Sequence, residues 1–333
     1  MYRVLVPAGI APAHPPINCA LRDFSGGSMG TSWSVRFIDT SACADVNWQA
    51  EIQTQLDRVV AQMSHWEAAS DLGRYNRAAA GTWHALPEDF LTVMRAALTV
   101  AEQSGGAYDP AAGALVNLWG FGPGGAFADA NFAMPEPSTI AEALAYCGWQ
   151  RVRLDGHRLL QPGGVQLDFS SIAKGYAVDL VARHLHAFGI DHFLVEVGGE
   201  LRGAGMKPDG QPWWVGLESP PDAQVPQTLV ALHGLSVATS GDYRRSFLRD
   251  GRRYAHTLDP RTGRPLEDAP ASVTVLHAEC MLADAWSTAL TVLGVTKGLA
   301  LAETLQLAAC FVMREEGGAF VEHRSSRFSE MLQ

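Results

Sequence analysis

The sequence predicts an α+β fold with mixed, largely antiparallel sheets flanked by helices. Strand-like and helix-like segments intermix along the chain, without the regular strand–helix–strand alternation of a parallel sheet. Turn sequences at Asp155-Gly156 and Gly317-Gly318 each separate two short strand-like segments, which is typical of antiparallel hairpins. The 333 residues suffice for one large domain or two modest ones, and no sharp linker divides them.

The elements are predicted in chain order from the spacing of their apolar residues. A strand is predicted over 32–39, where Trp33, Val35 and Phe37 occupy alternate positions. A helix is predicted over 47–64, because its apolar residues recur at helical spacing. The later elements are a helix from Pro87 to Gly105-Gly106, a loop over 120–137 that is a candidate lid, a short helix capped by Ser138 and ending at Gly148, a hairpin over 152–160, a helix over 171–188, strands over 192–197, 213–218, 229–233 and 272–277, helices over 282–293 and 297–307, and a hairpin around Gly317-Gly318.

Composition and charge exclude several classes of protein. Apolar residues make up 47% of the chain and charged residues 18%, which is too apolar for a disordered protein. The 25 basic and 35 acidic residues leave a formal net charge of −10, which argues against a nucleic-acid-binding surface. The longest apolar run, over 285–296, lies between Asp284 and Lys297. It is shorter than the ~20 residues of a membrane span, so no transmembrane segment is predicted.

The first 24 residues are predicted to form an extended arm, and residues 25–333 the main domain. Residues 1–20 contain a single Arg and four prolines, so they lack the basic start and the unbroken apolar segment of a signal peptide. Five cysteines, with no C-x-x-C pair among them, indicate reduced thiols and a reducing compartment. We therefore expect a cytoplasmic protein.

Asp284 and Thr288 form the first candidate site. They are four residues apart in a predicted helix, so their side chains project from the same face. A carboxylate and a hydroxyl on one face offer the hard oxygen ligands that Mg²⁺ prefers, completed by water and substrate phosphate. The alternative is structural: Asp284 complements the dipole at the helix N-terminus, while Thr288 packs in the core.

A second candidate site lies over 168–176, where a strand is followed by the start of the predicted helix over 171–188. Free N–H groups at a helix start attract phosphate, and Lys174 adds a positive charge one turn in. The glycine pattern of a Walker A loop is absent. In the structural alternative, Lys174 lies on a solvated helix face.

Further candidates come from a histidine, glycine turns and aromatic residues. His256 precedes the turn at Asp259–Gly263, where it serves either as a general base or as a structural residue that holds the turn. Glycine pairs with acidic ends occur at Gly105-Gly106 and at Gly198-Gly199-Glu200; glycine permits close approach of the backbone to a ligand, although most such pairs are only loops. The aromatic residues that can stack on a flat ring, or simply pack in the core, are Trp66, Tyr108, Trp119 and Trp213-Trp214.

The order of these segments along the chain carries the most specific signal. Eight blocks between roughly Gly26 and His323 resemble, in sequence and in order, the ApbE family of FAD:protein FMN transferases. The blocks are GSMGTSWSVRF, MSHWEAASDLGRYN, GAYDPAAGALVNLWGFG, LDFSSIAKGYAVD, VEVGGELRGAG, VATSGDYRR, YAHTLDPRTGRP and SVTVLHAECMLADAWSTAL. The resemblance covers nearly the whole chain and implies an ApbE-like fold.

The resemblance also implies which residues contact the flavin and the metal. A Met and an aromatic residue line the flavin in the family and correspond to Met29 and Trp66, where Trp replaces the commoner Tyr. The Mg²⁺ ligands correspond to the backbone carbonyl of Ser171, in place of the usual Ala, and to the side chains of Asp284 and Thr288. The remaining contacts to FAD correspond to Ala107, Tyr108, Asp109, Asp168, Lys174 and Leu258.

The implied reaction is the Mg²⁺-dependent transfer of FMN from FAD to a threonine hydroxyl of an acceptor flavoprotein, with release of AMP. His256, in the family's H-x-x-D-P block, is the candidate base for the threonine proton. Many family members are exported lipoproteins, but Cys19 follows no apolar segment here. The chain contains no acceptor motif of the family's kind, so we expect the acceptor to be another protein.

Two other functions stay open as hypotheses. Water in place of the threonine would make the protein a Mg²⁺-dependent FAD pyrophosphatase that yields FMN and AMP. The sequence does not separate these two activities, because the nucleophile is not part of this chain. The second alternative is a non-catalytic flavin-binding protein. Such a protein needs no metal and base together, so the candidate metal ligands and His256 argue against it.

Overall fold

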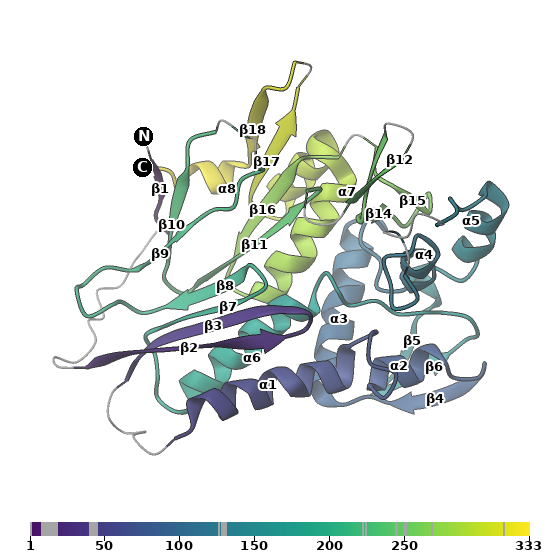
Figure 1. Cartoon of the computed structure of the whole chain (residues 1–333), viewed down its shortest axis with the longest axis horizontal. Helices are drawn as coiled ribbons and strands as arrows, with labels where there is room; N and C mark the ends of the chain where they lie inside the picture. The colour runs from purple at the N-terminus through teal and green to yellow at the C-terminus, as the bar shows by residue number, and fades with distance from the viewer. Residues whose placement is uncertain are drawn as a thin grey trace.

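An eight-stranded sheet forms the centre of the protein, in the strand order β18-β17-β16-β11-β8-β7-β3-β2 (Figure 1). Every neighbouring pair in it is antiparallel, which confirms the predicted α+β class. The computed structural model describes residues 2–7, 19–39, 46–125, 127, 132–221, 223, 225–243, 246–249, 252–267, 269–315 and 317–333. The strands are β2 (Ala20–Ser28), β3 (Thr31–Asp39), β7 (Phe193–Val197), β8 (Glu200–Ala204), β11 (Leu235–Gly241), β16 (Ser272–His277), β17 (Ala308–Arg314) and β18 (Phe320–Arg324).

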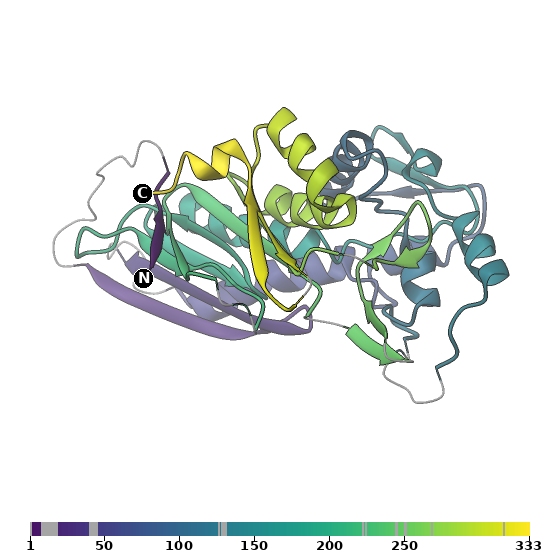
Figure 2. The same ribbon diagram turned by 90° about the horizontal axis from the view of Figure 1, so that it is seen from above.

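The two faces of this sheet are covered differently (Figures 1 and 2). Side chains alternate between the faces of a strand. Trp33, Val35 and Phe37 of β3 accordingly join a large core with helix residues, whereas Ile38 joins a second, smaller cluster. Helices α1 (Trp48–Met63), α3 (Glu88–Gln103), α6 (Ala173–Ala187) and α7 (Cys280–Thr304) contribute to the large core, and β1 (Arg3–Leu5), β10 (Thr228–Leu232), β9 (Trp213–Gly216) and α8 (Ser326–Ser329) contribute to the second.

The other short elements gather beyond one end of the eight-stranded sheet, on the right of Figure 1. They include a three-stranded sheet in the order β4-β6-β5 and two separate two-stranded ribbons. These elements are α2 (Asp71–Asn76), β4 (Thr82–Ala85), α4 (Gly113–Leu118), α5 (Pro137–Leu144), η1 (Trp149–Arg151), β5 (Arg153–Asp155), β6 (Arg158–Gln161), β12 (Ser246–Arg249), β13 (Arg252–Ala255), β14 (Leu258–Asp259) and β15 (Arg264–Pro265).

The predicted helices form where their apolar stripes indicate. The helix predicted over 47–64 is α1, whose first turn is capped by Asn47, with Oδ1 accepting from the Ala50 amide at 3.3 Å. The short helix after the candidate lid differs from the prediction: α5 begins at Pro137 after Glu136, and it ends at Leu144 rather than at Gly148. Ser138 is therefore inside α5 and is not its cap. The reason is that the backbone φ angle of Pro is fixed at a value that suits the first helical position.

The two helices predicted over 282–293 and 297–307 form one helical run, α7, broken only at Gly294. This residue has φ 70° and ψ 177°, which only glycine adopts readily. Among the described residues, α7 is the one helix long and apolar enough to cross a membrane by length and composition. Half of its most apolar window is buried, and it packs against α6, β11 and β16. Burial in the core accounts for its composition.

The N-terminal residues take part in the fold. β1 pairs in parallel with β10, and Leu5 is fully buried in the second cluster. The C-terminal residues cover β1, since the Val6 amide donates to the Met331 carbonyl at 2.9 Å. The predicted boundary between arm and domain, at residue 24, falls inside β2. Residues 8–18 of the predicted arm lie outside the described residues, as do residues 126 and 128–131 of the candidate lid.

We expect Leu5→Ala to lower the free energy of unfolding by about 2–4 kcal/mol, because it opens a cavity in a packed cluster. Urea unfolding followed by far-UV circular dichroism measures the change. Tyr2→Ala is the control, since the Tyr2 side chain is 65% exposed and its removal leaves no cavity. A loss in Leu5→Ala no larger than that in Tyr2→Ala would contradict the packing of β1.

Candidate functional site

Three chain segments meet at one end of the eight-stranded sheet. The β2–β3 turn at Met29-Gly30 and the β7–β8 turn at Gly198-Gly199 lie at the same end, because Trp33 of β3 pairs with Val197 of β7 (Figure 1). The C-terminal half of β11 reaches this end as well, since β8 and β11 are antiparallel neighbours. The sheet therefore presents turns and strand ends to the N-terminal regions of α6 and α7.

The Met29-Gly30 turn has an unusual backbone. Both residues have positive φ, 53° and 73°, as in the two-residue turns that suit the twist of a hairpin. Asn or Asp is the common residue at the first position, and a side chain such as that of Met is disfavoured there by about 1–2 kcal/mol. The structure thus keeps Met29 in a strained conformation at the end of the sheet where the other candidate residues gather.

Lys174, Glu200 and Asp284 form a charge cluster at this end. The Lys174 ammonium lies 2.7 Å from Glu200 Oε1 and 3.7 Å from Asp284 Oδ2. Both carboxylates are buried, at 2% and 3% exposed. A Cβ atom on Gly198 would lie 3.3 Å from Lys174 Cδ and 2.8 Å from Thr31 Cγ2, so the turn packs closely on the lysine. One cation against two carboxylates leaves the cluster with a net negative charge, which suits a metal ion.

The two candidate metal side chains lie on one helix, as predicted. Asp284 and Thr288 are one turn apart on α7. Asp284 Oδ2 accepts a hydrogen bond from the Gly175 amide at 3.1 Å, and Thr288 Oγ1 lies 3.1 Å from Ser240 Oγ of β11. Both oxygens are therefore held by neighbouring elements. Among the described residues, no three His, Cys, Asp or Glu side chains form a metal-binding group. A Mg²⁺ site here would rest on one carboxylate with neutral oxygens and substrate phosphate, a common arrangement for this ion.

Two buried polar atoms at the loop before α6, one from that loop and one from the segment after α3, have no hydrogen-bond partner among the described residues. Asp168 Oδ1 accepts from the Ser170 amide at 2.7 Å and lies 3.7 Å from His65 Nδ1, whereas Asp168 Oδ2 is one of the two orphaned atoms. The Tyr108 hydroxyl is the other, and it lies near the Ser171 side chain. Burial raises the pKa of Tyr108 well above its ordinary value. Orphaned buried polar atoms need an explanation, and a bound ligand is one.

Ala107 and Asp109 flank Tyr108 and have different surroundings. Ala107 is buried, while Asp109 is half-buried and accepts from the Ala111 amide at 2.8 Å. Burial raises the pKa of Asp109 to about 6.

Trp66 follows α1 and is 53% exposed, with its ring 5.3 Å from the ring of His65. The indole is therefore an open flat surface next to the Asp168 loop.

His256 and Leu258 lie in a separate group around Trp119. Leu258 is buried in an apolar cluster with Trp119 and Phe121, and the His256 ring lies 6.3 Å from that of Phe121. The segment approaches the Tyr108 loop, because a Cβ on Gly106 would lie 3.9 Å from Arg261 Cγ. His65 links Trp66 to Asp168, and the Tyr108 hydroxyl lies near Ser171, just before α6. Lys174 of α6 pairs with Asp284, which is one turn before Thr288 on α7. Ala107 and Asp109 flank Tyr108, Met29 lies in a turn at the same end of the sheet, and the segment with His256 and Leu258 reaches Gly106 through Arg261.

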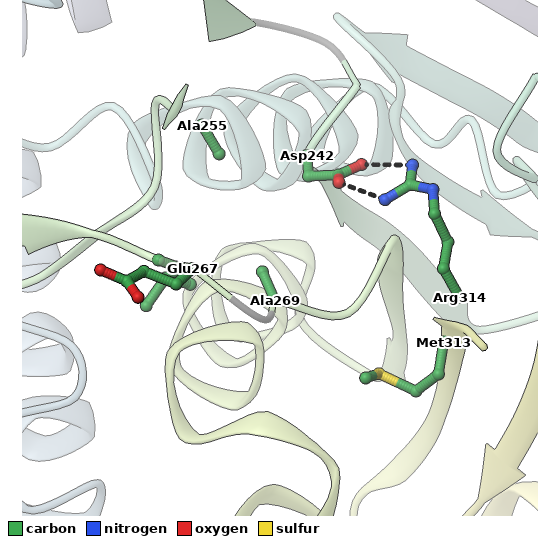
Figure 3. Close-up of a pocket in the computed structure, with 7 residues that line it drawn as sticks. Asp242, Ala255, Glu267, Ala269, Met313 and Arg314 are labelled. Atoms are coloured by element: carbon green, nitrogen blue, oxygen red, sulfur yellow. Dashed lines mark hydrogen bonds and ion pairs between the residues drawn. The ribbon is translucent and has the colours of Figure 1, made fainter. Parts of the chain in front are cut away.

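A cavity of about 420 Å³ adjoins this region (Figure 3). Its lining includes Asp242, which follows β11, and Ala255, which precedes His256. Arg314 of β17 donates to both Asp242 oxygens, at 2.5 and 3.0 Å. This bidentate pair ties the end of β11 to β17.

Sequence reasoning left three of these residues without a role. Glu200 was visible only as the acidic end of a glycine turn, and its burial against Lys174 is a tertiary contact. His65 lies inside the MSHWEAASDLGRYN block, yet nothing local predicts its approach to Asp168. Ser240 lies inside β11, and only the pairing of β11 with its neighbours places its hydroxyl beside Thr288.

The fold and the site define a class of protein: an antiparallel α+β protein that gathers buried carboxylates and a lysine at one end of its sheet, with an open indole next to the Asp168 loop. These groups suit a ligand with phosphates and flat rings. The ApbE family model matches residues 29–311, and the chain belongs to the ApbE family.

Similar proteins cover nearly the whole chain. The FAD:protein FMN transferase of Vibrio cholerae is 38% identical over 311 residues, which span 92% of each chain. The enzyme of that name from Haemophilus influenzae is 35% identical over 322 residues, with 93% of this chain and 91% of the relative covered. The crystal structure of the apo form of the Pseudomonas stutzeri flavinyl transferase ApbE superposes with a TM-score of 0.86 at 42% identity, covering 94% of this chain and 97% of the other.

Proposed function

We propose that this chain transfers FMN from FAD to a threonine hydroxyl of an acceptor flavoprotein, in a Mg²⁺-dependent reaction that releases AMP. That it is an enzyme of the FAD:protein FMN transferase class follows from its family and its relatives. One observation carries the finer proposal. The charge cluster combines a cation for a phosphate group with a net negative charge for a metal ion.

Different residues bind FAD and Mg²⁺. Lys174 supplies a positive charge to the FAD diphosphate, and the open indole of Trp66 supplies a surface for a flat ring. The side chains of Asp284 and Thr288 and the carbonyl of Ser171 would hold Mg²⁺. When bound, the ion neutralises phosphate charge and orients the leaving group.

The transfer step balances without an outside reactant. The threonine oxygen bonds to the phosphorus of the FMN half, while the bond from that phosphorus to the bridging oxygen breaks. AMP leaves with the bridging oxygen. The threonine proton passes to His256, which is half-buried with its ring 6.3 Å from that of Phe121.

The proposal is tested by looking for FMN covalently attached to an acceptor protein. Candidate acceptor flavoproteins are incubated with this chain, FAD and Mg²⁺, and intact-mass and peptide mass spectrometry locate the added FMN. We expect FMN on a threonine, and AMP release only when the acceptor is present. AMP release at the same rate without acceptor would show hydrolysis instead, and FAD binding with no AMP under any condition would show a flavin-binding protein.

We expect Lys174→Ala to weaken FAD binding about 10- to 100-fold, because a hydrogen bond to a charged group contributes about 1.5–3 kcal/mol. Fluorescence titration of FAD in the absence of acceptor measures the dissociation constant. Lys207→Ala is the matched control, since Lys207 pairs with Asp209, which is exposed. An unchanged dissociation constant in a folded Lys174→Ala variant would return Lys174 to a structural role.

A further inference from the structure

Helices α6 and α7 hold each other through a reciprocal pair of carboxylates. Asp179 of α6 accepts hydrogen bonds from the first two amides of α7, those of Cys280 at 3.1 Å and Met281 at 2.9 Å. In return, Asp284 of α7 accepts from the Gly175 amide of α6 at 3.1 Å. Gly175 and Asp179 are one turn apart on α6, and Cys280 and Asp284 are one turn apart on α7. One turn of each helix is therefore clipped to one turn of the other.

Asp179 replaces the cap that α7 lacks. The residue before the helix, Glu279, makes no side-chain hydrogen bond to the first turn. The first amides of a helix have no partner within the helix, and a negative charge there is favourable. Asp179, whose side chain is only 2% exposed, meets both needs from a different helix.

A second link fixes the same carboxylate to the sheet. Arg202 of β8 forms an ion pair with Asp179, and Lys174 of α6 forms one with Glu200 of β8. Two ion pairs of opposite polarity therefore join α6 to β8. Helices α6 and α7 are in close contact here, because a Cβ on Gly175 would lie 2.4 Å from the Cys280 carbonyl oxygen and leave no room for a side chain. The place of Asp284 beside Lys174 thus depends on how Asp179 seats the start of α7.

We propose that Asp179 is a positioning residue for the metal and diphosphate site. It acts through the first turn of α7 on Asp284, and it touches neither substrate nor metal. The inference rests on the proposed function, because it assigns Asp284 to Mg²⁺. Removing a group that orients a metal ligand lowers metal affinity about 10- to 100-fold.

The test measures Mg²⁺ binding rather than turnover. Mg²⁺ is titrated by isothermal calorimetry into the full-length protein with FAD present and no acceptor, well below the thermal midpoint of each variant. We expect Asp179→Asn, which keeps an oxygen acceptor but loses the charge, to raise the Mg²⁺ dissociation constant about 10-fold. Asp179→Ala, which loses both, is expected to raise it further. If Asp179→Ala fails to fold, the milder Asp179→Asn decides alone.

Asp89→Asn is the matched control. Asp89 is also buried, pairs with Arg58 of α1 and accepts from the Tyr176 hydroxyl of α6 at 2.5 Å. Its loss should lower the thermal midpoint with an unchanged Mg²⁺ dissociation constant. An unchanged constant in Asp179→Asn as well would overturn the inference and leave Asp179 with a structural role only.

Asp284→Ala separates this inference from the function beneath it. It should remove Mg²⁺ binding, and if it does while Asp179→Asn binds Mg²⁺ normally, only the positioning role of Asp179 fails. Normal binding in Asp284→Ala would contradict the proposed metal site itself, and the positioning role with it.

Discussion

Asp284→Ala should reduce AMP release from FAD by about 10³-fold or more, because it removes the only charged ligand of the proposed Mg²⁺ site. The remaining Lys174–Glu200 pair is neutral overall and offers no net charge to hold a cation. Phosphoryl transfer depends almost entirely on positioning and charge neutralisation, so this loss cannot be offset elsewhere in the site. Chromatography of AMP, with acceptor present and Mg²⁺ varied, measures the rate.

Asp284→Asn is the companion variant. It keeps an oxygen for the Gly175 amide, so the α6–α7 contact survives while the charge is lost. We expect it to be nearly as inactive as Asp284→Ala at low Mg²⁺. Near-normal turnover of Asp284→Ala at low Mg²⁺ would contradict the assignment of Asp284 as a metal ligand.

His256→Ala should lower FMN transfer by about 10²- to 10⁴-fold, the usual contribution of a positioned general base. His256 belongs to the group around Trp119 and not to the charge cluster. The His256→Ala variant should therefore bind FAD and Mg²⁺ almost normally. The measurements are mass spectrometry of the modified acceptor for transfer, and fluorescence titration and calorimetry for the two ligands.

His157→Ala is the control for this variant, since His157 is exposed in the β5–β6 turn. It should transfer FMN at the normal rate. A fully active His256→Ala would return His256 to a structural role beside the Asp259–Gly263 turn. Loss of FAD binding together with transfer would show instead that His256 helps to hold the substrate.

Local patterns predicted the elements whose residues interact mainly with near neighbours. The strand over 272–277 coincides with β16, and the hairpin over 152–160 coincides with β5 and β6. The helix over 171–188 begins two residues later, at Ala173. Periodicity and turn chemistry are properties of short windows, which is why these predictions succeed.

Elements that depend on distant partners escaped prediction. β1 has three residues, and it exists because Arg3 to Leu5 pair with Thr228 to Val230. The two-residue strands β14 and β15 likewise exist only as a pair. So short a segment has no periodicity of its own, and its pairing supplies both the hydrogen bonds and the burial.

The sequence by itself determined the family, the α+β class and the candidate residues, because each motif is a short run whose side-chain types and order can be read directly. It placed Asp284 and Thr288 on one helix, since spacing alone decides the face of a helix. Their roles in catalysis and metal binding stay predictions.

The tertiary structure alone decided how those residues meet. It brought Glu200 to Lys174, seated the start of α7 on Asp179, and left Asp168 Oδ2 and the Tyr108 hydroxyl buried with no hydrogen-bond partner among the described residues. These contacts join residues that are 26 to more than 100 positions apart. Their geometry follows from the packing of α6 and α7 against the antiparallel sheet, which no local window of the sequence contains.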